Sequence, residues 1–473
     1  MITIPLEPDS DQPMYIQIYE YIKNEILTGR LSCPERLPSA RSLAAYLQVS
    51  RSTVDTAYEQ LVAEGYVDAK EKRGYFVNSI TYTQKFTVSG HTEMVPDKIK
   101  KETVPVLYDF NPDAIDTAHF PYSVWKSIGK NQLDNPINFL AGDSLGIPEL
   151  RQSICDYLHG SRGVNCTPEN MIVGAGLDYL LQLLCVLFQR KAVIALEDPG
   201  YRSARQILTS NGYQILDIPL KGKAFDVDML RQSNADVCYV TPSHQFPLGS
   251  VMSIARRQKL LSWAHEKENR YIIEDDHDSE FRYKGKPIPA LQSLDKGYKV
   301  IYIGTFSKAI SPAIRMGYMV LPPALMTRYR TLCATYACPV PRISQAILND
   351  FIQGGYFEKH LNRMRKQYKG KHDYMLEQIR LHFPSGLIEL SGDNAGLYII
   401  VRYLGPLSAE EIEKRAEKNG IRLRPLHGYY ANLPADYLPS YLLGFADLSM
   451  EQIADGITCL AEKVFLPHDS YLS

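Results

Sequence analysis

The stretch GTFSKAISPAIRMGY, residues 304–318, sets a lysine among small hydroxyl side chains directly after an apolar run. Lys308 is flanked by Thr305 and Ser307, and Arg315 follows a few residues later. A lysine amine can form a Schiff base with a carbonyl compound, whereas hydroxyls and a guanidinium bind phosphate. The stretch therefore indicates an amine that performs covalent chemistry beside a phosphate.

Short apolar runs alternate with longer helical patterns from residue 107 onward. We expect strands at 171–173, 192–196, 237–240, 271–274, 299–303 and 317–321, and helices at 147–159, 177–189, 254–268 and 342–353. This alternation predicts an α/β domain with a mostly parallel sheet. Ligands bind at the carboxyl ends of the strands in such sheets, and polar or glycine residues follow several of these runs.

Pyridoxal phosphate would satisfy the chemistry of these strand ends. Lys308 supplies an amine for its aldehyde, and Asp275 supplies a carboxylate that keeps its pyridine nitrogen protonated. Tyr201 provides an aromatic ring to lie over the cofactor. The phosphate is assigned to the side chains of Thr305, Ser307 and Arg315 and to the backbone amides at the start of a helix, contributed by Gly176, Leu177 and Asp178.

The first eighty residues follow a different pattern. The segment LPSARSLAAYLQVSRSTVDTAYEQLVAEGYV predicts two short helices, capped by Ser39 and Ser50 and joined by the turn QVS. This is helix-turn-helix geometry. After it, YVDAKEKRGYFV predicts two short strands around a basic turn, which contains Arg73 and Gly74. The segment therefore reads as a small winged domain.

Charge and cysteine usage limit the function classes. The net charge is −1, and residues 1–80 hold 8 Lys+Arg against 11 Asp+Glu, so any contact with DNA must come from a local cluster of cations. The eight cysteines are scattered without metal-type spacing, and no signal peptide opens the sequence. We therefore expect free thiols, no metal site, no membrane segment and a cytoplasmic location.

Periodicity disappears between residues 81 and 106, which predicts a flexible or semi-extended linker. The predicted domains are thus a DNA-binding domain at 1–80, the linker at 81–106 and a cofactor-binding domain at 107–473. Within the last domain we expect a large part at about 107–355 and a smaller C-terminal part at about 356–473.

The order helix, helix-turn-helix and wing resembles the GntR-type winged helix over about residues 12–78. The motifs EDPGY, TPSHQFPLG, IEDDHDSEFRY and GTFSKAISPAIRMGY resemble the MocR/GabR subfamily of these regulators, in which the winged helix is fused to a fold-type I aminotransferase-like domain. The resemblance covers about residues 12–465. It implies a homodimer in a head-to-tail arrangement, and it implies DNA contacts by Arg41, Arg51, Ser52, Thr53, Arg73 and Gly74.

Two positions depart from the pattern of the subfamily. His277 stands where a tyrosine usually donates to the cofactor's ring hydroxyl, and it either takes over that contact or has no cofactor contact. Leu442 stands where aminotransferase-like chains often carry an arginine for a substrate carboxylate. Arg422 and Arg424 are the remaining candidates to bind an effector, unless they form surface ion pairs. If no arginine reaches the site, the effector is not a simple α-amino acid.

The sequence thus predicts a one-component transcriptional regulator that binds operator DNA and senses an amine. The amine would displace Lys308 and form an external aldimine, with negligible catalytic turnover. The alternative is a working aminotransferase with an accessory DNA-binding domain. A third reading is a DNA-binding protein whose large domain has lost the cofactor and only dimerises.

Overall fold

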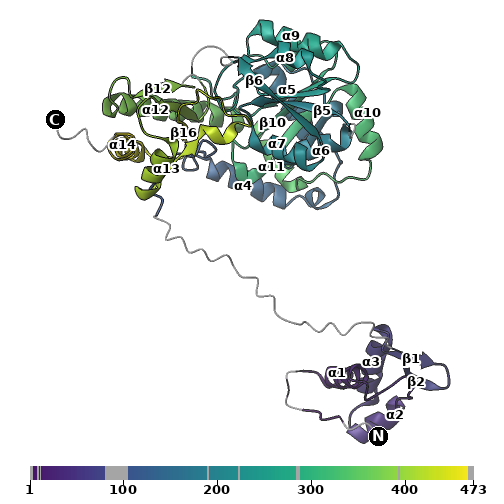
Figure 1. Ribbon diagram of the computed structural model, residues 1–473. Helices are drawn as coiled ribbons and strands as arrows, with labels where there is room; N and C mark the ends of the chain where they lie inside the picture. The colour runs from purple at the N-terminus through teal and green to yellow at the C-terminus, as the bar shows by residue number, and fades with distance from the viewer. Residues whose placement is uncertain are drawn as a thin grey trace. The chain divides into compact units, whose positions relative to one another are not determined.

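A computed structural model describes residues 4–7, 10, 12–79, 105–188, 191–221, 224–283, 288–392 and 395–466. The chain divides into two compact units, Met1–Lys101 and Glu102–Ser473 (Figure 1). Residues 81–104 of the expected linker lie outside the described residues. Among the described residues, no helix combines the length and the apolar character that crossing a bilayer requires.

The N-terminal unit is a winged helix. Helices α1 (Met14–Leu27), α2 (Ala40–Leu47) and α3 (Arg51–Ala63) precede the antiparallel strands β1 (Val67–Lys70) and β2 (Gly74–Val77). The Ser39 hydroxyl accepts a hydrogen bond from the Ser42 amide, and Ser50 accepts one from Thr53, so both predicted caps are confirmed. The two caps fix the starts of α2 and α3, and hence the helix-turn-helix between them.

The core of this unit comes from one face of each helix. Ile18, Ile22 and Ile26 of α1 pack with Val54 and Tyr58 of α3 in a single buried cluster. The spacing of three or four residues puts these side chains on one stripe, which leaves the opposite face of α3 in solvent. The exposed face of α3 is therefore available to a ligand.

The second unit is built on a mixed sheet. In the described residues it has eight strands in the order β4-β11-β10-β9-β8-β5-β6-β7. All neighbours from β10 through β6 are parallel, whereas β11 runs opposite to both of its neighbours and β7 opposite to β6. The prediction of a mostly parallel sheet is confirmed. The strands are β4 (Met171–Gly174), β5 (Val193–Asp198), β6 (Gln214–Lys221), β7 (Ala224–Phe225), β8 (Val237–Val240), β9 (Tyr271–Asp276), β10 (Val300–Thr305) and β11 (Gly317–Val320).

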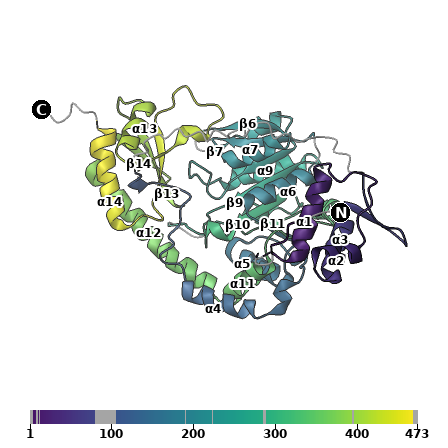
Figure 2. The same ribbon diagram turned by 90° about the horizontal axis from the view of Figure 1, so that it is seen from below.

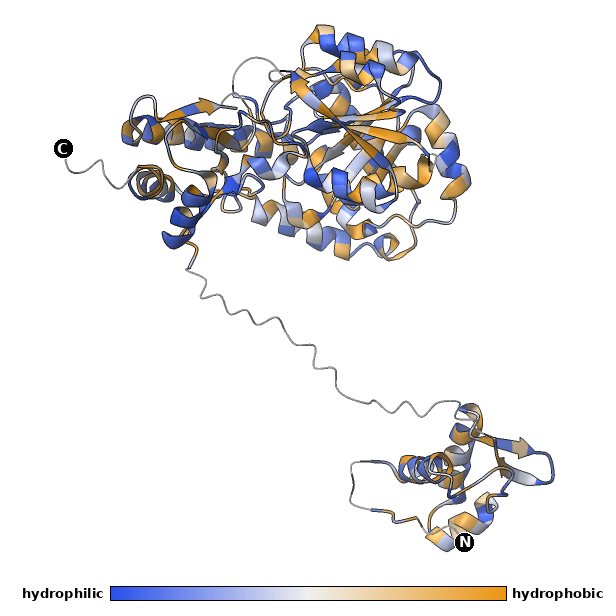
Figure 3. Cartoon of the chain, in the orientation of Figure 1, coloured by the Kyte–Doolittle hydropathy of each residue, from blue (hydrophilic) through white to orange (hydrophobic). Residues whose placement is uncertain are grey.

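Both faces of this sheet are covered. Ile194 and Leu196 of β5 pack into the cluster that contains residues of α6, α7 and α10, whereas Ala195 between them packs into the cluster of α8 and α9. Successive side chains of a strand point to opposite faces, so a strand buried on both sides must be apolar throughout. Figures 1 and 2 show helices on both faces, and Figure 3 shows the hydrophobic strands between them. The helices of this part are α4 (Tyr122–Leu133), α5 (Pro148–Arg162), α6 (Leu177–Leu187), α7 (Arg202–Ser210), α8 (Val227–Gln232), α9 (Ile254–His265), α10 (Pro323–Leu332) and α11 (Arg342–Gln353).

The C-terminal part carries a smaller antiparallel sheet. Its order is β12-β13-β16-β15 among the described residues, and the long helix α12 (Tyr356–His382) precedes it. The two-residue strand β14 (Ile421–Arg422) pairs with β3 (Tyr108–Asp109), which ties the start of this unit to its end. The remaining elements are β12 (Ile388–Ser391), β13 (Tyr398–Tyr403), β15 (Arg424–Pro425), β16 (Ser440–Gly444), α13 (Ala409–Lys418) and α14 (Met450–Cys459).

Candidate functional site

A cavity of about 250 Å³ lies where several strands of the large sheet end. Asp275 comes from β9, Thr305 ends β10, and Lys308 follows it. Nine of the ten residues predicted to hold the cofactor line this cavity, although they are far apart in the sequence. The lining residues are Asp113, Leu177, Asp178, Tyr201, Phe246, Asp275, His277, Asp278, Thr305, Ser307, Lys308, Pro312, Arg315 and Tyr398.

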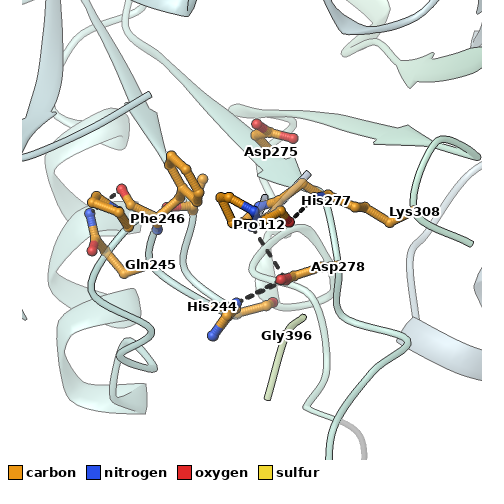
Figure 4. A network of polar contacts seen from close by, with 12 residues as sticks. Pro112, His244, Gln245, Phe246, Asp275, His277, Asp278, Lys308 and Gly396 are labelled. Carbon is orange, nitrogen blue, oxygen red and sulfur yellow. Dashed lines mark hydrogen bonds and ion pairs between the residues drawn. The ribbon is translucent and has the colours of Figure 1, made fainter. Parts of the chain in front are cut away.

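Lys308 lies on the turn after β10 and reaches the cavity. Its Nζ donates to the carbonyl of Pro112 over 2.6 Å (Figure 4). It also donates to the Asp113 Oδ1 over 2.9 Å. Burial acts to raise the pKa of Asp113, but the Lys308 ammonium, with His277 and Arg424, holds this pKa below its ordinary value. The Lys308 amine is therefore hydrogen-bonded to a carboxylate whose ionised form it stabilises.

Asp275 is the buried carboxylate of the cavity. Its Oδ2 accepts a hydrogen bond from the Tyr239 hydroxyl, and its Oδ1 is buried without a hydrogen-bond partner among the described residues. Burial raises the pKa of Asp275, and His277 and Tyr239 offset this effect in part. A buried carboxylate oxygen without a partner is costly, so this atom fits a cationic donor that a ligand would bring.

His277 belongs to a cluster with His244 and Asp278. The Nδ1 of His244 lies 2.9 Å from Asp278 Oδ2, and the Nε2 of His277 lies 3.4 Å from Asp278 Oδ1 (Figure 4). Burial acts to raise the pKa of Asp278, but the two imidazoles hold it well below its usual range. One ligand atom from each of the three side chains lies within 4.8 Å of the others, which is also a grouping that could hold a metal ion. Sequence spacing had pointed to no metal site.

The predicted phosphate side contains Arg315 and the start of α6. Arg315 Nη2 lies 3.3 Å from Asp178 Oδ2 and 3.5 Å from the carbonyl of Ala175. Gly176 has φ +84°, and a Cβ there would lie 3.4 Å from the guanidinium carbon of Arg315. Glycine therefore lets the arginine pass close to the backbone where the first amides of α6 have no partner within the helix.

Aromatic rings enclose the cavity on another side. The Phe246 ring lies 5.8 Å from that of Tyr201, 5.7 Å from His277 and 6.1 Å from Tyr398, measured between ring centres. Burial raises the pKa of Tyr201 to about 12. The rings of Tyr201, Phe246 and Tyr398 form an aromatic wall on one side of a cavity that also contains carboxylates, hydroxyls, a lysine and an arginine.

The two arginines predicted to bind an effector lie elsewhere. Arg422 Nη1 lies 3.1 Å from Asp109 Oδ2, and Arg424 Nη2 lies 3.0 Å from Asp109 Oδ1. Neither arginine lines the cavity, because both bind this shared carboxylate. Leu442 is fully buried in β16, directly opposite Arg424 in the strand pairing.

Sequence reasoning missed several residues of the cavity. Phe246 and Asp278 stand inside motifs that were recognised, so their motifs could have indicated them. Asp113 and Tyr398 have no local signal, because they come from an irregular segment and from a strand of the C-terminal sheet. Tertiary contacts alone bring these two to the cavity.

The winged helix exposes the residues predicted to bind DNA. Arg41, Arg51 and Ser52 are exposed, and Arg51 Nε lies 3.3 Å from Asp55 Oδ2 one turn along α3. The Thr53 hydroxyl lies 2.7 Å from that of Ser50, so the cap occupies it. The exposed cations are therefore the freer groups for contacts with a nucleic acid.

The turn between β1 and β2 exposes Arg73. Gly74 has φ +101°, and a Cβ there would lie 3.2 Å from Arg36 Nε. Arg36 is exposed and lies beside this turn, although the sequence reading did not single it out. Arg36, from the segment before α2, thus adds a second arginine beside the wing.

Comparison with known proteins identifies both parts of the chain. The family of bacterial regulatory proteins of the gntR type matches residues 14–77, and the aminotransferase class I and II family matches residues 113–432. The uncharacterized HTH-type transcriptional regulator YdeL of Bacillus subtilis is 39% identical over 458 residues, which cover 96% of this chain and 98% of the relative. The probable rhizopine catabolism regulatory protein MocR of Rhizobium meliloti is 32% identical over 479 residues, which cover 98% and 96%. The chain belongs to the MocR-type regulators of the GntR family.

A solved structure resembles the second unit of this MocR-type regulator. The kynurenine aminotransferase of Pyrococcus horikoshii has a TM-score of 0.67 and 27% sequence identity, and the match covers 77% of this chain and 91% of that one. The predicted combination of a winged helix and a fold-type I aminotransferase-like domain is therefore confirmed. The aminotransferase fold indicates pyridoxal phosphate as the cofactor of the MocR-type chain.

The residues of the cavity fit this cofactor. The unpartnered Asp275 Oδ1 suits a protonated ring nitrogen. Gly176 lets the Arg315 guanidinium lie close to the first amides of α6, and these donors together suit a phosphate. Lys308 supplies the primary amine that the aldehyde requires. The donor set of this MocR-type site thus matches the ring nitrogen, the phosphate and the aldehyde of pyridoxal phosphate.

Proposed function

We propose that this regulator senses a primary amine at the Lys308 cavity and changes its affinity for operator DNA in response. The observation that carries the proposal is the cavity itself, which collects the cofactor-directed residues in a chain that is similar to transcriptional regulators over almost its whole length. When bound, pyridoxal phosphate supplies an electrophilic carbonyl that combines reversibly with amines.

In this proposal each side chain has a separate role. Lys308 would hold the carbonyl carbon of the cofactor, Asp275 its ring nitrogen, and Arg315 with the start of α6 its phosphate. Tyr201 would cover one face of the ring. Because Asp278 lies beside His277 and carries a charge, it would orient the imidazole toward the ring hydroxyl. The hydroxyls of Thr305 and Ser307 and the backbone amides of Gly176, Leu177 and Asp178 would complete the phosphate site.

The winged helix would bind double-stranded DNA through the exposed cations. Arg41 and Arg51, with Ser52 and Thr53, would meet the DNA from α2 and α3, and Arg73 with Gly74 would do so from the wing. An amine can alter this binding only if its affinity differs between two arrangements of the protein. We assign that difference to the cavity. An anchor for the effector at Arg422 or Arg424 would require that arginine to leave its ion pair with Asp109.

We further propose a homodimer with a head-to-tail arrangement. Around α4 and the short helix η1 (Pro136–Phe139), five large apolar side chains are exposed, and Phe139 is exposed to 69% of its area. Several large apolar side chains exposed on neighbouring segments suggest a surface that a partner covers. The five residues are Tyr122, Leu133, Ile137, Phe139 and Leu140.

Two smaller proposals follow from the same function. The chain works in the cytoplasm, which a DNA-binding role requires and eight free cysteines support. Its domains are 1–80, a linker at 81–106 and 107–473, with the last divided near residue 355, because α12 begins at Tyr356.

The proposal is tested with full-length protein and DNA selected from a random library. The visible spectrum of the cofactor and the fluorescence anisotropy of the DNA are followed while a panel of primary amines is titrated. We expect an amine that changes the spectrum to change the Kd for DNA by about 5–150-fold. A spectral change that leaves the Kd unaltered for every amine would exclude the sensor role. Sustained formation of a carbonyl product would instead favour a working aminotransferase.

A further inference from the structure

Part of the cavity has no role in holding the cofactor. After the assignments above, the lining residues that remain are Asp113, Phe246, Asp278, Pro312 and Tyr398. An effector amine that reaches the cofactor must contact this remainder, because the other lining side chains are assigned to the cofactor. The chemistry of these residues therefore selects the effector.

Both charged groups in this remainder are carboxylates. Asp278 is occupied by His244 and His277, as described above. Asp113 contacts the Lys308 ammonium at 2.9 Å, and its side chain is 66% exposed. An anionic group on the effector would meet the negative charge of Asp113 and would find no arginine among the lining residues except Arg315, which lies beside Asp178 on the phosphate side.

The other groups are apolar. Phe246 and Tyr398 pack with Leu442 in one buried cluster, and Leu442 has no exposed surface. The Tyr398 hydroxyl donates to the carbonyl of Pro247 over 3.0 Å, so it is already engaged. A carboxylate of the effector would lose its hydration against these rings, and none of the described residues beside them would replace the lost hydrogen bonds.

Arg424 is the nearest alternative anchor. It contacts Asp109 at 3.0 Å, and Arg422 contacts the other oxygen of the same carboxylate at 3.1 Å. A rotation of Arg424 toward the cavity would give up its ion pair with Asp109. We therefore expect Arg424 to remain paired with Asp109 when an effector binds, and an Arg424 variant tests this expectation.

We infer that the effector is a primary amine that carries no carboxylate and whose far end is apolar or cationic. The inference rests on the proposed function, since it concerns the ligand of the same cavity. An apolar end packs against Phe246 and Tyr398, and a cationic end is attracted by Asp113. A carboxylate at that end is repelled by Asp113 and loses its hydration.

Three amines of equal chain length separate these cases: butylamine, 1,4-diaminobutane and 4-aminobutanoate. Each is titrated into full-length protein loaded with pyridoxal phosphate, and the visible spectrum and the heat of binding are both recorded. We expect butylamine and 1,4-diaminobutane to reach half of the spectral change at a concentration at least about tenfold below that of 4-aminobutanoate, because a like charge and a lost hydration shell both oppose the anion. The calorimetric order should be the same.

Two sets of variants test the residues. Asp113→Asn should reduce several-fold the ratio between the concentrations of 4-aminobutanoate and butylamine that give half of the spectral change. Asp113→Glu should keep this ratio. Thermal denaturation checks that both variants are folded. If 4-aminobutanoate binds best, and Arg424→Ala abolishes that preference, the inference is overturned while the proposed function stands. If the protein binds no cofactor, or the cofactor responds to no amine, the proposed function falls and this inference falls with it.

Discussion

His244 Nδ1 lies 2.9 Å from Asp278 Oδ2, and both side chains are almost completely buried. The two groups therefore form an ion pair or a charge-assisted hydrogen bond inside the domain, next to His277. Because the carboxylate faces two imidazoles, it is held ionised at neutral pH. This pair joins the segment that follows β8 to the segment that follows β9, and its loss can be measured.

We expect Asp278→Asn to lower the free energy of unfolding by about 1–3 kcal/mol at pH 7, since the variant removes the charge from a buried hydrogen bond. The folded pKa of Asp278 lies below its unfolded value of about 3.9, so its contribution is present above that pH and is lost as the pH falls. Urea denaturation should show that the difference in the free energy of unfolding between wild type and Asp278→Asn is constant from pH 8 to about pH 4. Between about pH 4 and pH 3 this difference should become smaller. A difference that stays constant throughout would contradict this assignment.

His360 of α12, which does not line the cavity, provides a second pH dependence. Its side chain is buried between Phe120 and Phe351, and burial, with the nearby Arg363, lowers its pKa to about 4. The unfolded chain takes up this proton near pH 6.5, so stability is complete above that pH and falls as the pH drops toward 4. Wild type should lose about 2 kcal/mol through this group between pH 7.5 and pH 5. His360→Gln should lack that loss, and parallel curves for the two proteins would refute the prediction.

Lys308 should be the residue that bonds to the cofactor. Borohydride reduction followed by peptide mapping should find one pyridoxyl group, attached to Lys308, and Lys308→Ala should lose it together with the visible absorption band. Lys369→Ala, which removes an exposed lysine of α12, serves as the matched control and should keep both signals. Attachment to any other lysine would contradict the assignment of the cavity.

The DNA contacts should divide into two kinds. Arg51→Ala and Arg41→Ala should each weaken binding to a selected DNA sequence by about 1–3 kcal/mol if the arginine reads a base edge. Arg73→Ala should weaken binding to all sequences about equally and reduce the salt slope by about one. Arg30→Ala removes an exposed arginine just after α1 and should change neither quantity. Fluorescence anisotropy at several salt concentrations measures the DNA affinity of all four variants. If Arg30→Ala and Arg51→Ala weaken DNA binding equally, the prediction that α3 contacts the DNA through Arg51 is wrong.

Turnover should be slow even when an amine binds. A transaminase binds carboxylated substrates in turn, whereas among the described residues Arg315, on the phosphate side, is the one arginine that lines this cavity. We expect carbonyl-product formation well below the roughly 1–10³ per second of ordinary enzymes. Single-turnover absorbance and product analysis with an amino acid and a keto acid measure this rate. A rate in the ordinary range would establish the aminotransferase reading.

The sequence by itself determined the winged helix, six strands of the large sheet and the candidates for residues that bind the cofactor. The caps at Ser39 and Ser50 and the apolar stripe of α3 are local, because a helix needs partners for its first amides and one buried face. The strands of the large sheet could also be predicted from local sequence, because strands that are buried on both faces are continuously apolar. Residues that follow such strands meet at one edge, so Lys308 and Asp275 could be placed together without a structure.

The tertiary structure alone decided what surrounds them. Asp113 meets Lys308 across 195 positions of the chain, and Tyr398 reaches the cavity from a separate sheet. Arg422 and Arg424 are two positions apart in the sequence, and both were candidates for the site. In the structure both form ion pairs with Asp109, which lies in the strand β3 that pairs with β14. No local pattern encodes these contacts, because the choice of an ion-pair partner depends on which distant segments the packing of apolar faces brings together.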